Sequence, residues 1–94
     1  LVHIGHNGTV GQNVIIAAQT GLSGSVTIGS RSLVGGQVGI LEHTTVGEGV
    51  QIGAQSGVVR DIPDKGSALG TPAENSMKMK RMYAALRQLT DTER

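Results

Sequence analysis

The chain has 94 residues, a formal net charge of +1, one tyrosine, and no phenylalanine, tryptophan or cysteine. So few aromatic residues argue against an ordinary globular core, and the lack of cysteine excludes a disulfide framework and a thiolate site. The near-neutral charge gives no general attraction to nucleic acid or membrane. No apolar run is long enough to cross a membrane and no signal-peptide pattern is present, so we expect no membrane span and a cytoplasmic setting.

The first part of the chain is a six-residue repeat. An aliphatic residue opens each hexad without a miss, at Ile4, Val10, Ile16, Leu22, Ile28, Val34, Ile40, Val46, Ile52 and Val58. The fifth position of each hexad is small or β-branched, and Gly8 occupies it in the first. A short fixed period of this kind is typical of a solenoid, so the sequence predicts an all-β parallel β-helix of hexapeptide repeats over residues 1–70.

The hexads group in threes, which predicts three short strands per coil and a triangular prism. Gln19, Gln37 and Gln55 lie 18 residues apart in matching segments. Complete coils then cover 4–21, 22–39 and 40–57, and the glutamines should stack as a ladder along one edge. We expect the glycines two residues after them to lie at the turns, where the absence of Cβ permits unusual φ angles; these are Gly21, Gly39 and Gly57.

Beyond Val58 the repeat decays and the composition changes. Pro63, Gly66 and the run Gly70-Thr71-Pro72 are turn signals that close the stack of coils. Residues 73–90 are strong helix formers without glycine or proline, so the sequence predicts a helical extension over 71–94. One helical stripe, expected to pack inward, consists of Met79, Met82, Tyr83, Leu86 and Leu89. The chain also opens within the repeat, so we expect it to be the C-terminal part of a longer protein.

Two histidines are candidates for chemistry. His6 is the third residue of the first hexad and His43 the fourth residue of the seventh, which places them on one face, two coils apart. At about 4.8 Å per coil they would be separated by roughly 9–10 Å. Between them Gly24 occupies the position equivalent to His6.

This arrangement fits acyl transfer. Histidine can accept a proton from an attacking amine at neutral pH, and an unshielded glycine N–H can stabilise the oxyanion of the intermediate. The alternative is that both histidines are ordinary surface residues. No acidic residue is clearly placed to orient His6.

The motifs carry a family resemblance. The segments IGHNGTVGQNVIIAAQTGLSGSVTIG, VGGQVGILEHTTVG and IGAQSGVVRDIP, followed by GTPA and a basic helix, resemble the C-terminal two-thirds of the UDP-3-O-(3-hydroxyacyl)glucosamine N-acyltransferases of lipid A biosynthesis. Parallel crossovers are normally right-handed. The resemblance implies instead a left-handed β-helix, and it covers essentially the whole chain.

The resemblance also implies roles and partners. His6 would be the general base, Gly24 the oxyanion donor, and His43 a second active-site residue that binds substrate. The donor would be a 3-hydroxyacyl chain on acyl carrier protein and the acceptor UDP-3-O-acylglucosamine, with no cofactor. Members of the family are homotrimers with active sites between neighbouring prisms. Carrier protein is acidic, so the basic residues of the helix are candidates for binding it; they are Lys78, Lys80, Arg81 and Arg87.

Other functions remain open from the sequence. The related lipid A O-acyltransferase shares the hexads. A trimeric zinc enzyme of the carbonic anhydrase type would need His3, His6 and His43 as ligands, but their order and spacing fit poorly. A third alternative is a non-catalytic scaffold that displays the basic helix.

Overall fold

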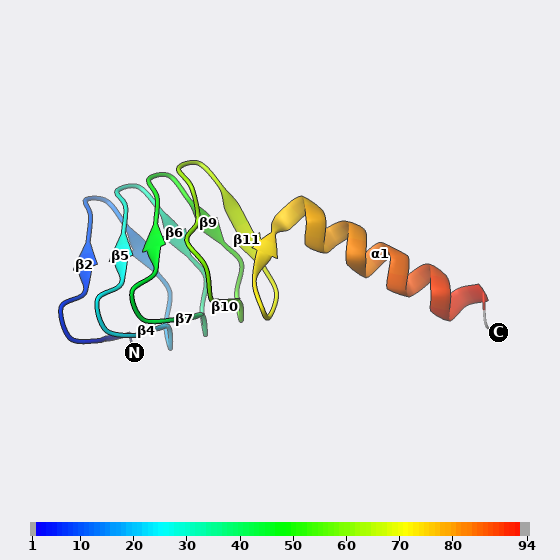
Figure 1. The fold of residues 1–94 in the computed structure, drawn as a ribbon, viewed down its shortest axis with the longest axis horizontal. Coiled ribbons are helices and arrows are strands. Elements are labelled where there is room, and N and C mark those ends of the chain that lie inside the picture. Colours follow the sequence, from blue (N-terminus) through cyan, green and yellow to red (C-terminus); the bar gives the residue numbers. More distant parts are fainter. Residues whose placement is uncertain (1, 93–94) are drawn as a thin grey trace.

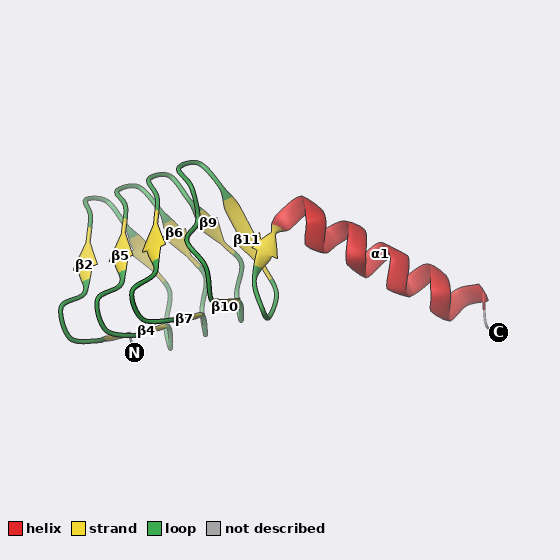
Figure 2. Cartoon of the chain, in the orientation of Figure 1, coloured by secondary structure: helices red, strands yellow, loops and turns green. Residues whose placement is uncertain are grey.

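The computed structural model describes residues 2–92, which form a left-handed parallel β-helix followed by one α-helix that extends from its end (Figures 1 and 2). The molecule measures 50 × 23 × 20 Å along its principal axes. The solenoid and its handedness, predicted from the repeat and from the family resemblance respectively, are confirmed.

Three sheets form the sides of the prism. The first contains β1 (His3–Ile4), β4 (Gly21–Leu22), β7 (Gly39–Ile40) and β10 (Gly57–Val58). The second contains β2 (Thr9–Val10), β5 (Thr27–Ile28) and β8 (Thr45–Val46). The third contains β3 (Ile15–Ile16), β6 (Leu33–Val34), β9 (Gln51–Ile52), β11 (Ser67–Leu69) and β12 (Glu74–Asn75). Within each sheet, strands of consecutive coils pair in parallel, and paired residues are 18 positions apart, as for Leu22 and Ile40. This spacing holds up to the last coil, which is shorter.

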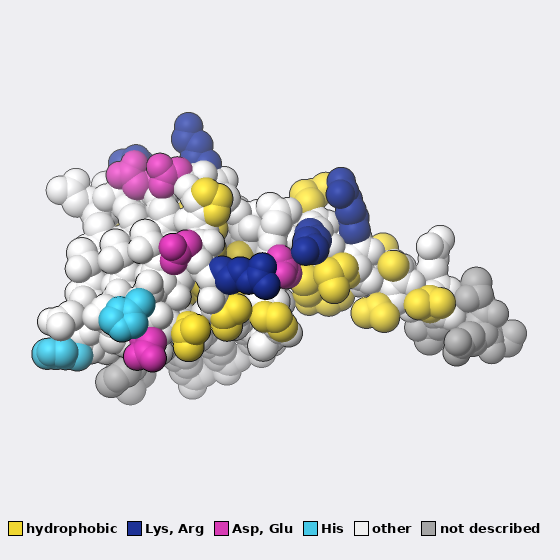
Figure 3. All heavy atoms as spheres, viewed as in Figure 1, with side chains coloured by type: hydrophobic (Ala, Val, Ile, Leu, Met, Phe, Trp, Pro, Cys, Tyr) yellow, Lys and Arg dark blue, Asp and Glu magenta, His cyan; other side chains and the backbone are white. Residues whose placement is uncertain are grey.

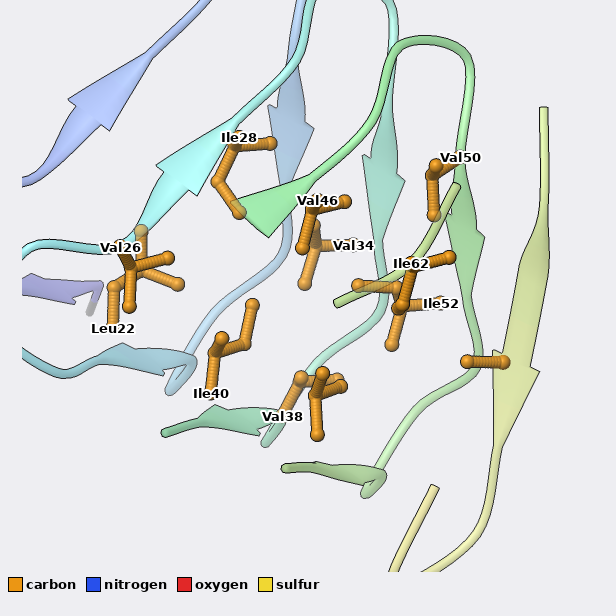
Figure 4. Close-up of a cluster of buried hydrophobic side chains, with 12 residues drawn as sticks. Leu22, Val26, Ile28, Val34, Val38, Ile40, Val46, Val50, Ile52 and Ile62 are labelled. Atoms are coloured by element: carbon orange, nitrogen blue, oxygen red, sulfur yellow. The ribbon is translucent and has the colours of Figure 1, made fainter. Parts of the chain in front are cut away.

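The interior is a stack of aliphatic side chains (Figure 4). The hexad-opening residues from Leu22 to Val58 are all at most 3% exposed. Fully burying a side chain of this size stabilises a fold by about 1.5–3 kcal/mol. Ile4 and Val10 are 48% and 38% exposed, because the described chain places a coil against them on one side only.

Hydroxyl groups also lie in the interior, and hydrogen bonds offset the free-energy cost of burying them. Thr20 Oγ1 donates to the Gly35 carbonyl at 2.8 Å, and Ser32 Oγ donates to the Gly47 carbonyl at 2.9 Å. No buried side-chain nitrogen or oxygen lacks a partner in the described part of the chain. The fifth hexad position therefore accepts small polar residues because the backbone of a neighbouring turn supplies an acceptor.

The turns confirm one expectation and correct another. The glutamine ladder is present, since Gln37 Nε2 donates to Gln19 Oε1 at 2.9 Å and Gln55 Nε2 donates to Gln37 Oε1 at 2.8 Å. The placement of Gly21, Gly39 and Gly57 at turns is wrong: these glycines lie in β4, β7 and β10, and their φ angles are not positive. The left-handed conformation falls instead on the fourth residue of the hexad, which includes the glutamines themselves, with φ of 58–64°.

The stack closes by a route that the sequence did not indicate. Ile62 forms an isolated parallel bridge with Val46, and β11 pairs in parallel with β9. The chain then reverses, and β12 pairs with β11 in antiparallel orientation. The sheet therefore includes residues 74–75, which were expected to belong to the helical extension.

Helix α1 (Ser76–Thr92) begins after Asn75, whose Oδ1 accepts hydrogen bonds from the N–H groups of Met77 at 3.0 Å and Lys78 at 3.3 Å. This is an N-cap. Of the predicted stripe only Met79 is buried, at 7% exposed, and it packs against the turn at Gly70. The expectation that the whole stripe packs inward is wrong for this chain: the other four members are 45–60% exposed, because the helix leads away from the prism.

Candidate functional site

His6 and His43 lie at the same corner of the prism, as the hexad count predicts. His6 is in the turn at 6–7, which follows β1, and His43 is in the turn at 42–43, which follows β7. The turn at 24–25 follows β4, between these two strands in the sheet order. We call this column of three turns the site corner. Both imidazoles are exposed, and Figure 3 shows the histidine side chains on one face near the N-terminal end of the prism.

Backbone hydrogen bonds fix the stacking of these turns. The Ser25 N–H donates to the His6 carbonyl at 2.8 Å, and the His43 N–H donates to the Gly24 carbonyl at 3.1 Å. His43 has a φ of 61°, a conformation that histidine adopts more readily than most residues. The backbone therefore holds both histidines and Gly24 in adjacent layers of one rigid column.

Gly24 presents a free backbone donor. Its N–H makes no hydrogen bond to any described residue, whereas its carbonyl accepts from His43. A Cβ built on Gly24 would approach one atom, the His6 carbonyl oxygen, at 3.4 Å, which is ordinary van der Waals contact. The glycine is thus not required by packing within this chain, and its N–H is available to a ligand.

The side chains of His6 and His43 have no hydrogen-bond partner among the described residues. The sequence found no acidic residue to orient His6, and the described structure supplies none either.

An open groove runs beside the site corner along the outer surface of the first sheet. Its volume is about 550 Å³, and its floor includes Gly21, Gly39 and Gly57, with Gly24 at its edge. A Cβ on Gly21 or Gly39 would meet nothing within 4 Å, whereas one on Gly57 would lie 3.0 Å from the methyl carbon of Thr71, which covers that end of the surface. We call this surface the glycine face. The missing side chains keep it flat and accessible, which suits a long extended ligand.

The basic residues of helix α1 are far along the molecule from the histidines (Figures 1 and 3). Lys78 Nζ pairs with Glu74 Oε2 at 3.6 Å, and Arg60 pairs with the same carboxylate at 3.9 Å. The other three predicted basic residues are exposed. The Lys78 side chain is itself 62% exposed, so all four predicted basic residues face solvent and the pair with Glu74 is a surface ion pair.

Glu42 also lies at the site corner and was not singled out from the sequence. It is the third residue of its hexad, the same position as His6 and Gly24 in the two preceding coils, and its side chain is exposed. The 18-residue register was enough to find it, because His6, Gly24 and Glu42 are spaced by 18 residues.

The zinc alternative gains no support from the described residues. They contain no group of three or more histidine, cysteine, aspartate or glutamate side chains that could hold a metal ion. The side chain of His3 lies outside the described part of the chain. Within residues 2–92 the structure also contains no helix with the length and apolar character needed to cross a membrane.

Comparison with known proteins identifies acyltransferases. No protein-family model matches the chain. UDP-3-O-acylglucosamine N-acyltransferase 1 from Gloeobacter violaceus is 62% identical over 89 residues, which cover 95% of this chain and 26% of that protein. The chain thus spans about a quarter of the length of this curated relative, so the expectation that it corresponds to two-thirds of such an enzyme is wrong.

Solved structures agree on the fold. LpxA from Acinetobacter baumannii superposes with a TM-score of 0.78 at 33% identity, covering 86% of this chain and 33% of that one. UDP-N-acetylglucosamine acyltransferase from Campylobacter jejuni gives 0.77 at 35% identity, covering 79% and 29%. A mutant perosamine N-acetyltransferase from Caulobacter crescentus, in complex with CoA and GDP-perosamine, gives 0.78 at 28% identity, covering 80% and 36%.

Proposed function

Because the chain belongs to the UDP-3-O-acylglucosamine N-acyltransferase family, we propose that it forms the acyl-transfer part of an enzyme of lipid A biosynthesis. The reaction would move a 3-hydroxyacyl chain from acyl carrier protein to the 2-amine of UDP-3-O-acylglucosamine. The observation that carries the mechanism is the site corner, where an exposed histidine and an unpartnered glycine N–H occupy adjacent layers.

His6 serves as the general base. The amine nitrogen attacks the thioester carbonyl carbon while the imidazole removes the proton that the amine must lose. The C–N bond forms, the C–S bond breaks, and the proton taken by His6 is returned to the departing carrier thiolate. The products are an amide and a free thiol, so protons and charge balance without a cofactor.

Gly24 serves as the oxyanion donor. The carbonyl oxygen becomes negative in the tetrahedral intermediate, and a backbone N–H already free of other partners stabilises it without rearrangement. His43 lies one layer further along the site corner and would bind the substrate near the reacting carbonyl.

The glycine face would receive the acyl chain. Its open volume of about 550 Å³ borders Gly24, so a chain attached to the carbonyl could lie along the bare backbone of β4 and β7. Burial of methylene groups against this surface contributes about 0.8 kcal/mol each when complete.

The exposed part of helix α1 supports two partner proposals. Met82, Tyr83, Leu86 and Leu89 leave an apolar stripe exposed, which fits the homotrimer that the family resemblance implies. Lys80, Arg81 and Arg87 lie outside that stripe, and with Lys78 they would attract an acidic carrier protein. We expect the reaction in the cytoplasm, where such a donor would be encountered.

An acyl-transfer assay tests the proposal. The intact protein that carries this chain would be given UDP-3-O-acylglucosamine with the 3-hydroxyacyl group on either carrier protein or coenzyme A. We expect N-acylated product from the carrier-protein donor, and His6→Ala should lower kcat/KM by about 10²–10⁴-fold with the fold unchanged.

Gln12→Ala provides a matched control, because Gln12 is an exposed residue at the third hexad position of the neighbouring corner. Its activity should match that of the unaltered protein. Full activity of His6→Ala would refute the assignment of the base. An O-acylated product, or a preference for the coenzyme A thioester, would move the protein to another hexapeptide-repeat acyltransferase class.

A further inference from the structure

The groove along the glycine face has one polar side chain among its described lining residues, and that side chain belongs to Ser23. Every other residue that the structure places along the groove is a glycine or carries an aliphatic side chain. Ser23 is exposed, and its hydroxyl group forms no hydrogen bond with any described residue. This hydroxyl therefore has both a donor and an acceptor to offer to a ligand in the groove.

Ser23 is the second residue of its hexad, and a comparison with the other coils shows that a hydroxyl at this position is specific to one layer. The equivalent residues on the first sheet are Gly5, Leu41 and Val59. Leu41 and Val59 are 51% and 45% exposed, so they give the groove apolar side chains in the layers beyond Ser23. The groove is thus polar in the layer of Gly24 and apolar in the layers that follow.

Ser23 directly precedes Gly24, whose N–H is the proposed oxyanion donor. Consecutive Cα atoms are about 3.8 Å apart, so a ligand meets the Ser23 hydroxyl and the Gly24 N–H within the length of one residue. In a 3-hydroxyacyl thioester the hydroxyl group is on the second carbon beyond the carbonyl carbon. A donor whose carbonyl oxygen accepts from Gly24, and whose chain enters the groove, therefore brings its 3-hydroxyl within reach of Ser23.

We propose that Ser23 is a specificity-determining residue that recognises the 3-hydroxyl group of the acyl donor. This inference rests on the proposed function, and it assigns the choice of a hydroxylated chain to one side chain. The Ser23 hydroxyl donates to the substrate hydroxyl or accepts from it. No covalent bond changes in this contact, and the Gly24 N–H stays free for the carbonyl oxygen.

The discrimination arises from desolvation. An acyl chain that lies along the groove covers Ser23 and removes its hydroxyl from solvent. A donor with a 3-hydroxyl replaces the lost solvent contact with a hydrogen bond, whereas an unhydroxylated chain leaves the Ser23 hydroxyl without a partner. A covered polar group left unpaired is costly, which is how a site rejects an analogue that lacks a hydroxyl.

A competition experiment with the intact protein tests the proposal. Equal amounts of a 3-hydroxyacyl carrier protein and the unhydroxylated acyl carrier protein of the same chain length would be offered together with UDP-3-O-acylglucosamine. Mass spectrometry of the two N-acylated products gives the ratio of the two kcat/KM values directly. We expect the hydroxylated product to dominate with the unaltered protein. Ser23→Ala should lower the ratio about three- to ten-fold, which is the contribution of one hydrogen bond of ordinary strength.

Ser23→Thr and Leu41→Ala are the matched variants. Ser23→Thr keeps a hydroxyl, and the β-branched Val59 already occupies this hexad position in a later coil, so the preference should be retained. Leu41→Ala removes an apolar contact one coil further along the same groove, so it should slow both donors alike and leave the ratio unchanged. Alanine is compatible with this hexad position, since Ala17 occupies it in the third hexad.

A product ratio in Ser23→Ala equal to that of the unaltered protein overturns the proposal. An equal loss of rate with both donors also overturns it, because Ser23 would then contact the carrier arm or the acceptor sugar, which the two reactions share. Transfer by the unaltered protein without preference for the hydroxylated chain overturns this inference and leaves the proposed function standing. If the unaltered protein transfers neither chain, the proposed function fails and this inference fails with it.

Discussion

Gly24→Ala is the sharpest test of the oxyanion donor, because the structure predicts that it alters the site and leaves the fold intact. The added Cβ would have one close neighbour, the His6 carbonyl oxygen at 3.4 Å, and the φ of Gly24 is not in the left-handed region. A Gly→Ala change at a compatible position stabilises a protein by about 0.4–1 kcal/mol. For a domain of this size that corresponds to a rise of a few degrees in Tm, on the scale of roughly 4–8 °C per kcal/mol.

The expected effect on activity is a loss. The new methyl group projects into the open space beside the N–H that the thioester carbonyl must approach to about 2.7–3.1 Å. Impairing a single oxyanion donor costs about 10²–10³-fold in kcat. Because the substitution shields the N–H without removing it, we expect a loss of about 10²-fold, measured as kcat with saturating donor.

Gly36→Ala is the matched control. Gly36 occupies the third hexad position at another corner, between Ala18 and Ala54 in the adjacent coils, and a Cβ there would lie 3.3 Å from the Ala18 carbonyl oxygen. Because this approach is tighter than the one at Gly24, any rise in Tm should be smaller, and the activity should stay unchanged. Unchanged kcat in Gly24→Ala would refute the oxyanion role, and a fall in Tm large enough to explain the lost activity would refute the steric argument.

Two further predictions concern the helix and the core. The double charge reversal Lys80→Glu/Arg87→Glu should raise the KM of the carrier-protein donor several-fold at low salt. The control Arg31→Glu/Lys65→Glu changes the net charge by the same amount on the prism and should leave this KM unchanged. Equal effects of the two double variants would assign the result to net charge alone. Ser32→Ala should lower the free energy of unfolding by about 1–3 kcal/mol, measured by urea denaturation, because the buried Ser32 Oγ donates to one backbone group at 2.9 Å and accepts from another at 3.1 Å. A change below the experimental error would show that the neighbouring backbone groups find other partners.

The sequence by itself determined the solenoid, its register and the residues that stack. A strict six-residue period places the same kind of side chain inward in every layer, so the coil geometry, the glutamine ladder and the common corner of His6 and His43 all follow from counting. Because each layer of a repeat protein contacts mainly its neighbours, the local sequence pattern specifies nearly all of the tertiary contacts.

Only the tertiary structure decided the features that depend on contacts across layers. It moved Gly21, Gly39 and Gly57 from turns to a bare sheet surface, because the left-handed residue is set by how the turns stack and not by which residue lacks a Cβ. It left most of the stripe on helix α1 exposed, because the reversal through β12 directs the helix away from the prism. Whether the Gly24 N–H has a hydrogen-bond partner likewise depends on which groups of the next coil reach it, and the sequence of a single hexad does not predict this.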